Sequence, residues 1–270
     1  MSAPMRTIAI GLCLLVWVVA NAQDEAARQP TPGDNLAAGI ECSFDPAPKY
    51  KYCTDEDDPF QLTDGLYNGC VWTDPGTVGW QMRRDPVFLV DIDLGEVAPI
   101  GAVTFDTVTG GAQVTFPAAA LVFVSEDGQS YRYLGDIFTE ALPQDKHLNH
   151  RFVADGLKGW GRYVRIAIIS GGFYSFCDEI EVMRGNHTAA EATYASEELI
   201  GADAVRAWAN DRIAWVTQKN ATLTILREAS AAIDARAEFV EDQALVAAAR
   251  AAVRRWPDRG PRHDRRCCWP

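Results

Sequence analysis

A polar loop early in the chain carries the oxygen atoms that a cation site would need. The stretch DDPFQLTDGLYNGCVW begins at Asp57, and within it Asp64 and Asn68 offer side-chain oxygens. Gly65 and Gly69 allow tight turns that would aim backbone carbonyls inward. Calcium takes about six to eight oxygens from carboxylates, amides and carbonyls. The same residue types also make a plain turn with solvated acids, so both interpretations stay open.

Aromatic residues on two later segments could hold a sugar ring. TVGWQMRRDP contains a tryptophan close to two arginines, and SGGFYSF places two aromatic residues on a glycine-rich turn. Sugar sites combine an aromatic ring with charged or amide groups that bind the hydroxyls of the sugar. We therefore expect a binding patch that contains Trp80, Arg84, Phe173 and Tyr174. The alternative for Trp80 is a buried, purely structural role.

Four cysteines remain once the two ends of the chain are set aside. Cys13 lies in the N-terminal apolar run, and the last two cysteines lie in a basic, proline-rich tail. The others are Cys42, Cys53, Cys70 and Cys177, an even number that allows two disulfides in three pairings. We favour Cys42–Cys53 together with Cys70–Cys177. No C-x-x-C occurs, so the sequence does not indicate a zinc site.

The sequence carries none of the common catalytic motifs. No G-x-S-x-G, H-E-x-x-H or P-loop occurs. His147 and His150, in KHLNH, have no obvious Ser or Cys partner, and we expect them to be solvated loop residues. A catalytic pair of carboxylates is not readable from one sequence. The sequence therefore predicts a protein that is not an enzyme.

Short alternating apolar segments between residues 84 and 184 must position these side chains. In PVFLVDIDLG the residues on one face are Phe88, Val90, Ile92 and Leu94. Similar segments recur about every ten residues with turn signals between them, which gives about eight strands. Nothing between them is long enough for a crossover helix. This predicts a mainly β fold, an antiparallel β-sandwich or jelly roll over 34–185.

The sequence after residue 185 has a different composition. It is rich in Ala, Glu and Arg, which is typical of helices. Apolar positions recur there every seven residues, at Leu226, Ile233, Val240 and Ala247. The pattern predicts an α-helical hairpin or coiled coil over 189–256, with the break at QKNAT, 218–222. We expect it to act as a spacer or to mediate self-association. Residues 257–270 are expected to be an unstructured tail, truncated or frameshifted.

The chain opens with the pattern of a secretory signal peptide. Arg6 precedes an apolar run that ends at Ala20-Asn21-Ala22, and the run is too short for a stable membrane span. We expect cleavage after Ala22 and a secreted or periplasmic, bacterial protein. The formal net charge of −12 provides no electrostatic basis for binding nucleic acid. The acidic run 55–58 is expected to face solvent.

Several motifs together resemble the discoidin, or coagulation factor 5/8 type C, family. Its bacterial relatives are the family-32-like carbohydrate-binding modules, which have a galactose-binding-like fold. The resemblance covers residues 34–185 and rests on NLAAG at 35–39, QLTDG at 61–65 with Trp72 after it, VDIDLGEVAPIGAV at 90–103 and GRYVRIAII…FCDEIEVMRG at 161–185.

The resemblance implies a structural calcium ion in the Asp-Gly loop, with Asp64, Asn68 and Glu179 as ligands. It also implies a sugar site on loops at one end of the sandwich. We therefore expect an exported, non-catalytic carbohydrate-binding module, the N-terminal ancillary part of a polysaccharide-acting protein. The alternatives are a fragment of a glycoside hydrolase or polysaccharide lyase and a cell-surface adhesion or assembly protein, because one fold can serve all these roles.

Overall fold

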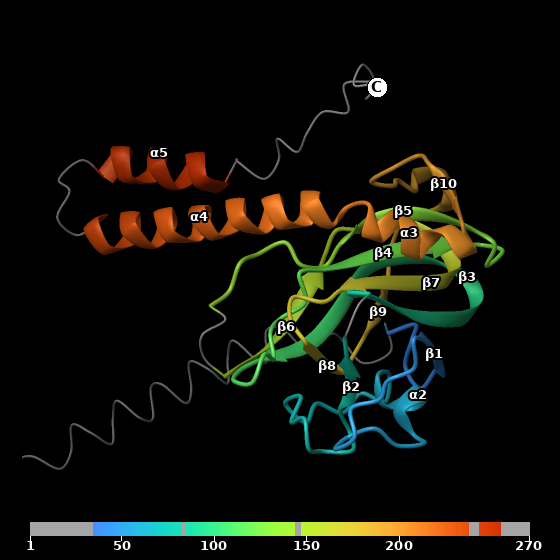
Figure 1. Ribbon diagram of the computed structural model, residues 1–270. Helices are drawn as coiled ribbons and strands as arrows, with labels where there is room; N and C mark the ends of the chain where they lie inside the picture. The colour runs from blue at the N-terminus through green and yellow to red at the C-terminus, as the bar shows by residue number, and fades with distance from the viewer. Residues whose placement is uncertain (1–34, 83–84, 144–146, 238–242, 255–270) are drawn as a thin grey trace, which may run out of the picture.

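A computed structural model describes residues 35–82, 85–143, 147–237 and 243–254. It consists of a β-sandwich from which two helices project (Figure 1). The predicted signal peptide, Arg84 and the predicted tail lie outside the described residues. No helix in the described part of the chain is long and apolar enough to cross a membrane.

The named strands form one ten-stranded, antiparallel network that folds into the layers of the sandwich. This confirms the predicted antiparallel β-sandwich. The strands are β1 (Cys42–Asp45), β2 (Val78–Gln81), β3 (Val87–Thr109), β4 (Ala119–Ser125), β5 (Ser130–Asp136), β6 (Leu148–Ala154), β7 (Gly159–Ile169), β8 (Tyr174–Glu179), β9 (Val182–Arg184) and β10 (Leu199–Gly201).

The long strand β3 joins the layers. Its first part pairs with β1 and β7, and its second part pairs with β6, β8 and β9. The sequence suggested two strands separated at Pro99, but the chain continues through this residue as one strand with a register shift between Asp93 and Ala98. The carbonyl of Pro99 accepts the N–H of Gly185, so the proline still takes part in pairing. One strand thus belongs to both layers.

The first residues of β3 are apolar on both faces of the strand. Phe88, Val90 and Ile92 are buried between the layers, as their alternation predicts. Val87 and Leu89 point to the outer face, which would be open to water in a bare sandwich. The segment after residue 185 covers that face (Figure 1).

The structure of this covering segment corrects the prediction that the helical region begins at residue 189. Between 189 and 212 the chain forms two short 3-10 turns, the strand β10 paired with β5, and the helix α3 (Val205–Asn210). Trp208 of α3 packs against Phe123 and Tyr133, with ring centroids 5.2 and 5.0 Å apart. Helix propensity alone could not reveal this, because the exposed apolar sheet face decides where the segment docks.

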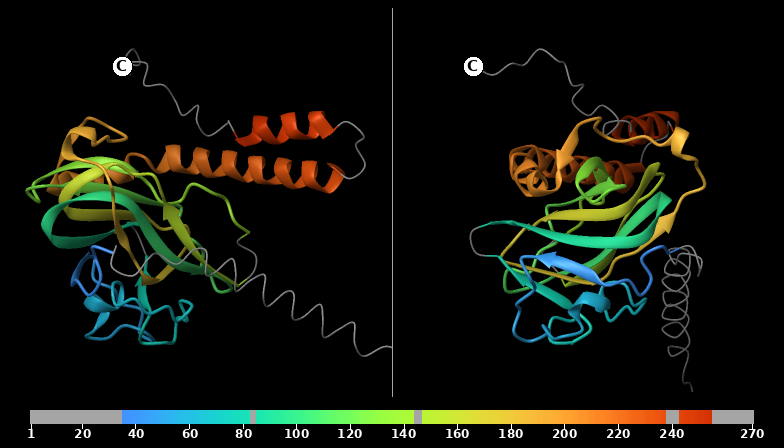
Figure 2. Two further views of the ribbon diagram at one scale, coloured as in Figure 1. Left: turned by 180° about the vertical axis from the view of Figure 1, so that it is seen from behind. Right: turned by 90° about the vertical axis from the view of Figure 1, so that its right-hand side faces the viewer.

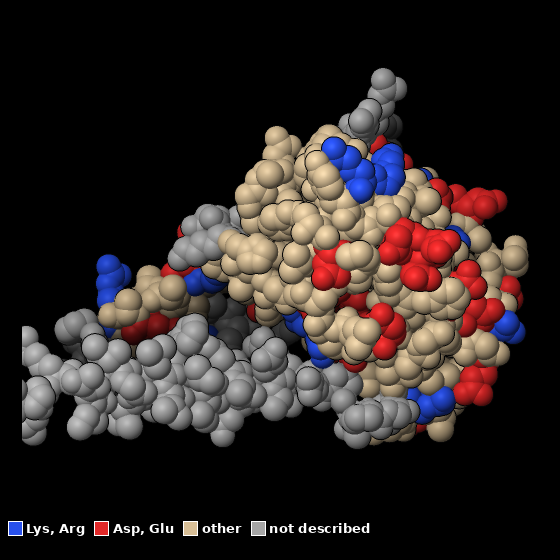
Figure 3. Space-filling model, turned by 90° about the horizontal axis from the view of Figure 1, so that it is seen from below, with Lys and Arg blue, Asp and Glu red and all other residues tan. Residues whose placement is uncertain are grey.

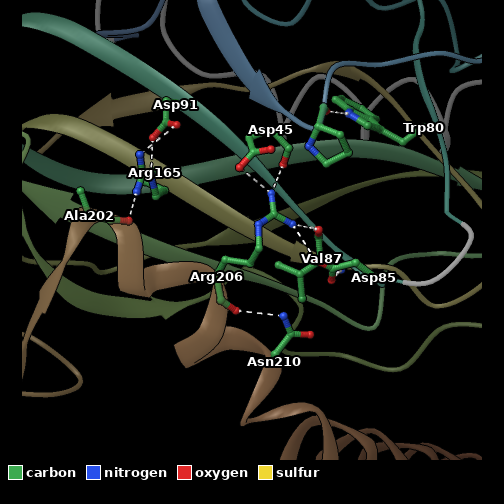
Figure 4. A network of polar contacts seen from close by, with 10 residues as sticks. Asp45, Trp80, Asp85, Val87, Asp91, Arg165, Ala202, Arg206 and Asn210 are labelled. Carbon is green, nitrogen blue, oxygen red and sulfur yellow. Dashed lines mark hydrogen bonds and ion pairs between the residues drawn. The ribbon is translucent and has the colours of Figure 1, made fainter.

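Arg206 ties α3 to the end of β1 and to the start of β3 with the loop before it (Figure 4). Its guanidinium lies 2.8 Å from the Asp45 carboxylate and 3.2 Å from that of Asp85. It also donates hydrogen bonds to the backbone carbonyls of Asp45 and Val87. The C-terminal segment is therefore bound to the sandwich by charge as well as by apolar packing.

The projecting helices are α4 (Ile213–Ala237) and α5 (Gln243–Arg254), which lie side by side (Figure 2). The break predicted at 218–222 is wrong, since this segment lies inside α4. Its polar residues instead hold the helix to the sheet, because Lys219 pairs with Asp136 and the Asn220 amide donates to the Ala118 carbonyl over 2.8 Å.

Candidate functional site

Backbone N–H groups of the Asp-Gly loop hold this loop against strand β8. The N–H of Gly65 donates to Oε2 of Glu179 over 3.0 Å. The N–H groups of Asn68 and Cys70 both donate to Oδ2 of Asp178, over 3.1 and 3.0 Å. Hydrogen bonds to carboxylates are stronger than those between neutral groups, so two acids of β8 order the whole turn.

The predicted calcium ligands in this loop serve local turns. Oδ1 of Asp64 accepts the N–H of Leu66 over 2.7 Å. Oδ1 of Asn68 accepts the N–H of Cys70 over 2.9 Å and the hydroxyl of Thr77 over 3.0 Å. These contacts belong to the Asx-type turn that was the alternative interpretation.

Beneath the loop lies a group of buried acids with unused oxygens. Oδ1 of Asp106, Oδ1 of Asp178 and Oε1 of Glu179 are buried and have no hydrogen-bond partner within the described residues. Burial raises the pKa of Glu179 to about 9, and the negative charges of neighbouring acids add to the effect. Burial, followed by the charge of Asp178, raises the pKa of Asp106 to about 8.

Unused carboxylate oxygens in such a place are the donor atoms that a hard cation takes. In the described part of the chain, however, no three His, Cys, Asp or Glu side chains converge into a metal-binding group. A calcium ion beside Glu179 would therefore also need backbone carbonyls or water. The residues fit calcium in donor chemistry.

The structure contradicts both predicted disulfides. Cys42, Cys53, Cys70 and Cys177 are buried free thiols. Cys42 lies in the core between the layers, whereas Cys53 lies in a separate apolar cluster beside Phe176. Burial raises the pKa of Cys42 and of Cys53 to about 12, so both remain protonated at neutral pH. The even count was misleading because free cysteine is also a common core residue.

Trp80 has the buried, structural role that was the alternative to sugar binding in the sequence analysis. Only 1% of its surface is exposed. Its ring stacks on Phe88 with centroids 4.5 Å apart, and its Nε1 donates to the carbonyl of Pro46 over 3.2 Å. A ring that is almost fully buried and whose polar atom is engaged offers nothing to a ligand, which corrects the predicted role of Trp80 in sugar binding.

Phe173 and Tyr174 join two tyrosines that sequence reasoning missed. The ring of Tyr174 lies 5.3 Å from that of Tyr50, which in turn lies 5.6 Å from Tyr52. Phe173 packs edge-on against Tyr174 at 4.8 Å. We call these four residues the loop aromatic cluster. The spacing Tyr-Lys-Tyr just before Cys53 was the available signal, since it puts two rings on one short loop.

The loop aromatic cluster continues inward to Trp72. Phe176 lies below it, 4.9 Å from Tyr50 and 6.0 Å from Trp72. Trp72 then packs edge-on against His147 at 5.5 Å. The predicted solvated position of His147 is confirmed by its exposure, but His150 bonds to Glu140 at 3.0 Å and packs on Phe152. Tyr52, 56% exposed, is the most exposed ring of the loop aromatic cluster.

One of the four early acids is not solvated. Asp58, at the start of the short helix α2 (Asp58–Gln61), is buried, and its Oδ2 has no hydrogen-bond partner in the described chain. Burial raises its pKa to about 6. Asp55, Glu56 and Asp57 are exposed as expected. Acidic side chains also gather in patches over the lower face of the molecule, with few basic ones among them (Figure 3).

Comparison with known proteins finds solved structures that are similar to this chain at low sequence identity. No protein-family model matches the chain, and no curated protein matches it. Among solved structures, CpGH89CBM32-5 from Clostridium perfringens, in complex with GalNAc-β-1,3-galactose, is 13% identical, with a TM-score of 0.38, over 54% of this chain and 95% of that one.

Two further solved structures are similar in the same way. A fucose-binding module from Streptococcus pneumoniae is 17% identical, with a TM-score of 0.38, over 58% of this chain and all of its own. The lectin domain of lectinolysin, complexed with Lewis B antigen, is 13% identical, with a TM-score of 0.39, over 57% of this chain and 99% of its own.

Proposed function

We propose that this chain is an exported, non-catalytic carbohydrate-binding module that holds a sugar ring on the loop aromatic cluster. The observation that carries the proposal is the exposed ring of Tyr52, which contacts Tyr50, which in turn contacts Tyr174. An aromatic ring that is open on one face and fixed on the other packs well against the C–H face of a sugar. The sequence resemblance to carbohydrate-binding modules is independent support.

Polar groups beside the rings could bind the hydroxyls of the sugar. The ammonium of Lys51 lies 4.4 Å from the centroid of the Tyr52 ring. Gln113 is exposed, and its backbone carbonyl accepts the N–H of Tyr174 over 3.3 Å. A site of this type is shallow and buries few groups, so we expect modest affinity for each sugar unit.

We also propose that calcium stabilises the Asp-Gly loop, with Asp64, Asn68 and Glu179 as the nearby ligands. The support is the buried Oε1 of Glu179, which lacks a partner within the described residues. Calcium would neutralise a carboxylate that burial otherwise favours in its protonated form. Its role would be structural, since the side chains of the loop aromatic cluster supply the proposed sugar contacts.

The helical hairpin would separate the module from a further part of a polysaccharide-acting protein or mediate self-association. The charged pair Arg250 and Asp234, 2.8 Å apart, holds α5 to α4 along the projecting part. Export follows from the signal-peptide pattern and remains part of the proposal.

A glycan array with the mature chain tests the proposed function. We expect binding that the Tyr52→Ala and Tyr174→Ala variants lose. The matched control is Trp215→Ala, which removes an exposed aromatic ring from α4, away from the loop aromatic cluster. Binding that both tyrosine variants retain would refute the proposed site.

A further inference from the structure

The short helix α2, at the loop end of the sandwich (Figure 1), carries two buried oxygen atoms that the described chain does not use. Its residues Asp58 and Gln61 are only 3% and 8% exposed. Oδ2 of Asp58 and Oε1 of Gln61 have no hydrogen-bond partner within the described residues. Buried polar atoms normally have a partner, so these two oxygens point to a bound group at this place.

Asp55 brings the two side chains together. Its Oδ1 accepts Nε2 of Gln61 over 3.0 Å, and its backbone N–H donates to Oδ1 of Asp58 over 3.4 Å. The amide and the carboxylate therefore both lie beside one residue. They are also three residues apart on α2, which places them on the same side of one helical turn.

The orientation of the Gln61 amide is fixed by its neighbour. A flipped amide would place Oε1 against Oδ1 of Asp55, and both atoms are acceptors. The same Oδ1 also accepts the N–H of Asp57 over 2.9 Å, which holds the carboxylate in place. Oε1 of Gln61 is therefore an acceptor that faces away from Asp55 and lacks a donor among the described residues.

The buried carboxylate of Asp58 also lacks a counter-charge. It makes no ion pair with a basic side chain of the described residues. A buried charge is costly unless it is paired or binds a metal ion, and oxygen atoms are the ligands of hard cations. One buried carboxylate supplies one charge, and the described residues hold no group of three His, Cys, Asp or Glu around a metal. These donors therefore match a monovalent cation better than a divalent one.

We propose that a sodium ion binds between Asp58 and Gln61. It would take Oδ2 of the carboxylate and Oε1 of the amide, with water on the exposed side next to Asp55. Its role would be structural, because it would neutralise the buried carboxylate and hold α2 to the loop before it. The site shares no residue with the loop aromatic cluster or with the proposed calcium ligands, so it depends on neither proposal.

Thermal melting of the mature chain in two salts tests the inference. Sodium chloride and tetramethylammonium chloride are compared at equal ionic strength with EDTA present, because tetramethylammonium is too large to bind between two buried oxygens. We expect a melting temperature about 3 °C higher in sodium, since a ligand at about ten times its Kd favours the folded state about tenfold. Equal melting temperatures in the two salts would overturn the proposal.

Variants assign the effect of sodium to this site. Asp58→Asn keeps the shape of the side chain and removes its charge, so it should abolish the difference between the two salts. In tetramethylammonium chloride this variant should be more stable than the natural chain, and sodium should narrow the gap. Asp57→Asn, at the exposed neighbouring position, and Glu179→Gln, in the Asp-Gly loop site, should keep the full difference. A difference that persists in Asp58→Asn would be a general salt effect and would overturn the inference.

Sodium NMR gives a measurement that does not depend on stability. The sodium signal should broaden when the natural chain is added, because a bound ion tumbles with the protein. Asp58→Asn should broaden it clearly less. Equal broadening by the two chains would assign the sodium to the acidic surface and not to the buried oxygens, which would contradict the proposed site.

Discussion

The backbone N–H of Gly65 donates to the carboxylate of Glu179 over 3.0 Å, joining positions 114 residues apart in the chain. This bond fixes the Asp-Gly loop to β8. The other carboxylate oxygen of Glu179 is buried without a partner within the described residues. The relationship suggests why the loop is ordered and where a cation would add stability.

Calcium should raise the melting temperature of the mature chain. A ligand that binds only the folded state at about 100 times its Kd adds about 2.7 kcal/mol, which corresponds to several degrees in a protein of this size. Thermal melting with saturating calcium and with EDTA measures the shift. Glu179→Gln should abolish the shift, whereas Glu126→Gln should preserve it. An equal melting temperature with calcium and with EDTA would refute the calcium proposal.

Asp58 should make the protein less stable as the pH rises. Its pKa is raised to about 6 in the folded state, so its stabilising contribution is complete below about pH 4 and is lost as the pH rises through about 6. Asp58→Asn should therefore be more stable than the natural chain at pH 7 by about 1 kcal/mol, and this advantage should disappear near pH 4.

Urea unfolding of both chains across this pH range measures the difference. Asp57→Asn, at the exposed neighbouring position, is the control and should show no such trend. An advantage of Asp58→Asn that is the same at pH 4 and pH 7 would show that titration of Asp58 is not its cause.

Arg206→Met should destabilise the whole sandwich. The change leaves two carboxylates and two backbone carbonyls without their common donor. We expect a loss of about 2 kcal/mol in the free energy of unfolding, because the side chain is mostly buried. Arg184→Met, which removes the exposed pair with Glu96, should cost less than about 1 kcal/mol. A single urea transition with unchanged midpoint in Arg206→Met would contradict the view that α3 is part of the sandwich.

A reducing agent should not change the stability of the chain. The four described cysteines are free thiols, whereas removal of a native disulfide typically costs about 2 to 5 kcal/mol. Urea unfolding with and without dithiothreitol makes the comparison. A midpoint that falls on reduction would restore the disulfide prediction.

The sequence pattern was sufficient to predict the strands and the residues buried between the layers. Phe88, Val90 and Ile92 alternate, and alternation directly reports a face. The same pattern placed Val87 and Leu89 on the other face but could not say what covers them. The answer lies in Trp208 and its neighbours, whose high-propensity surroundings suggested a helix separate from the sandwich.

The candidate site was only partly readable from the sequence. Phe173 and Tyr174 were identified because a glycine-rich turn marked them as loop residues. Trp80 was misassigned, since a strand of four residues next to arginines looks like a loop until its pairing with β8 is known. Tyr52 was missed because its place in the candidate site depends on a contact of Tyr50 with Tyr174, which lies far away in the chain. The spacing Tyr-Lys-Tyr marks two rings on one loop, but the contact of Tyr50 with Tyr174 arises from tertiary packing.

The most direct test of the proposed function is the binding of a glycan identified on the array, measured by isothermal titration calorimetry. The account predicts a single weak site for the mature chain, a loss of at least about tenfold in affinity in Tyr52→Ala and in Tyr174→Ala, and no change in Trp215→Ala. Full affinity in both tyrosine variants, with their folds intact by circular dichroism, would contradict it.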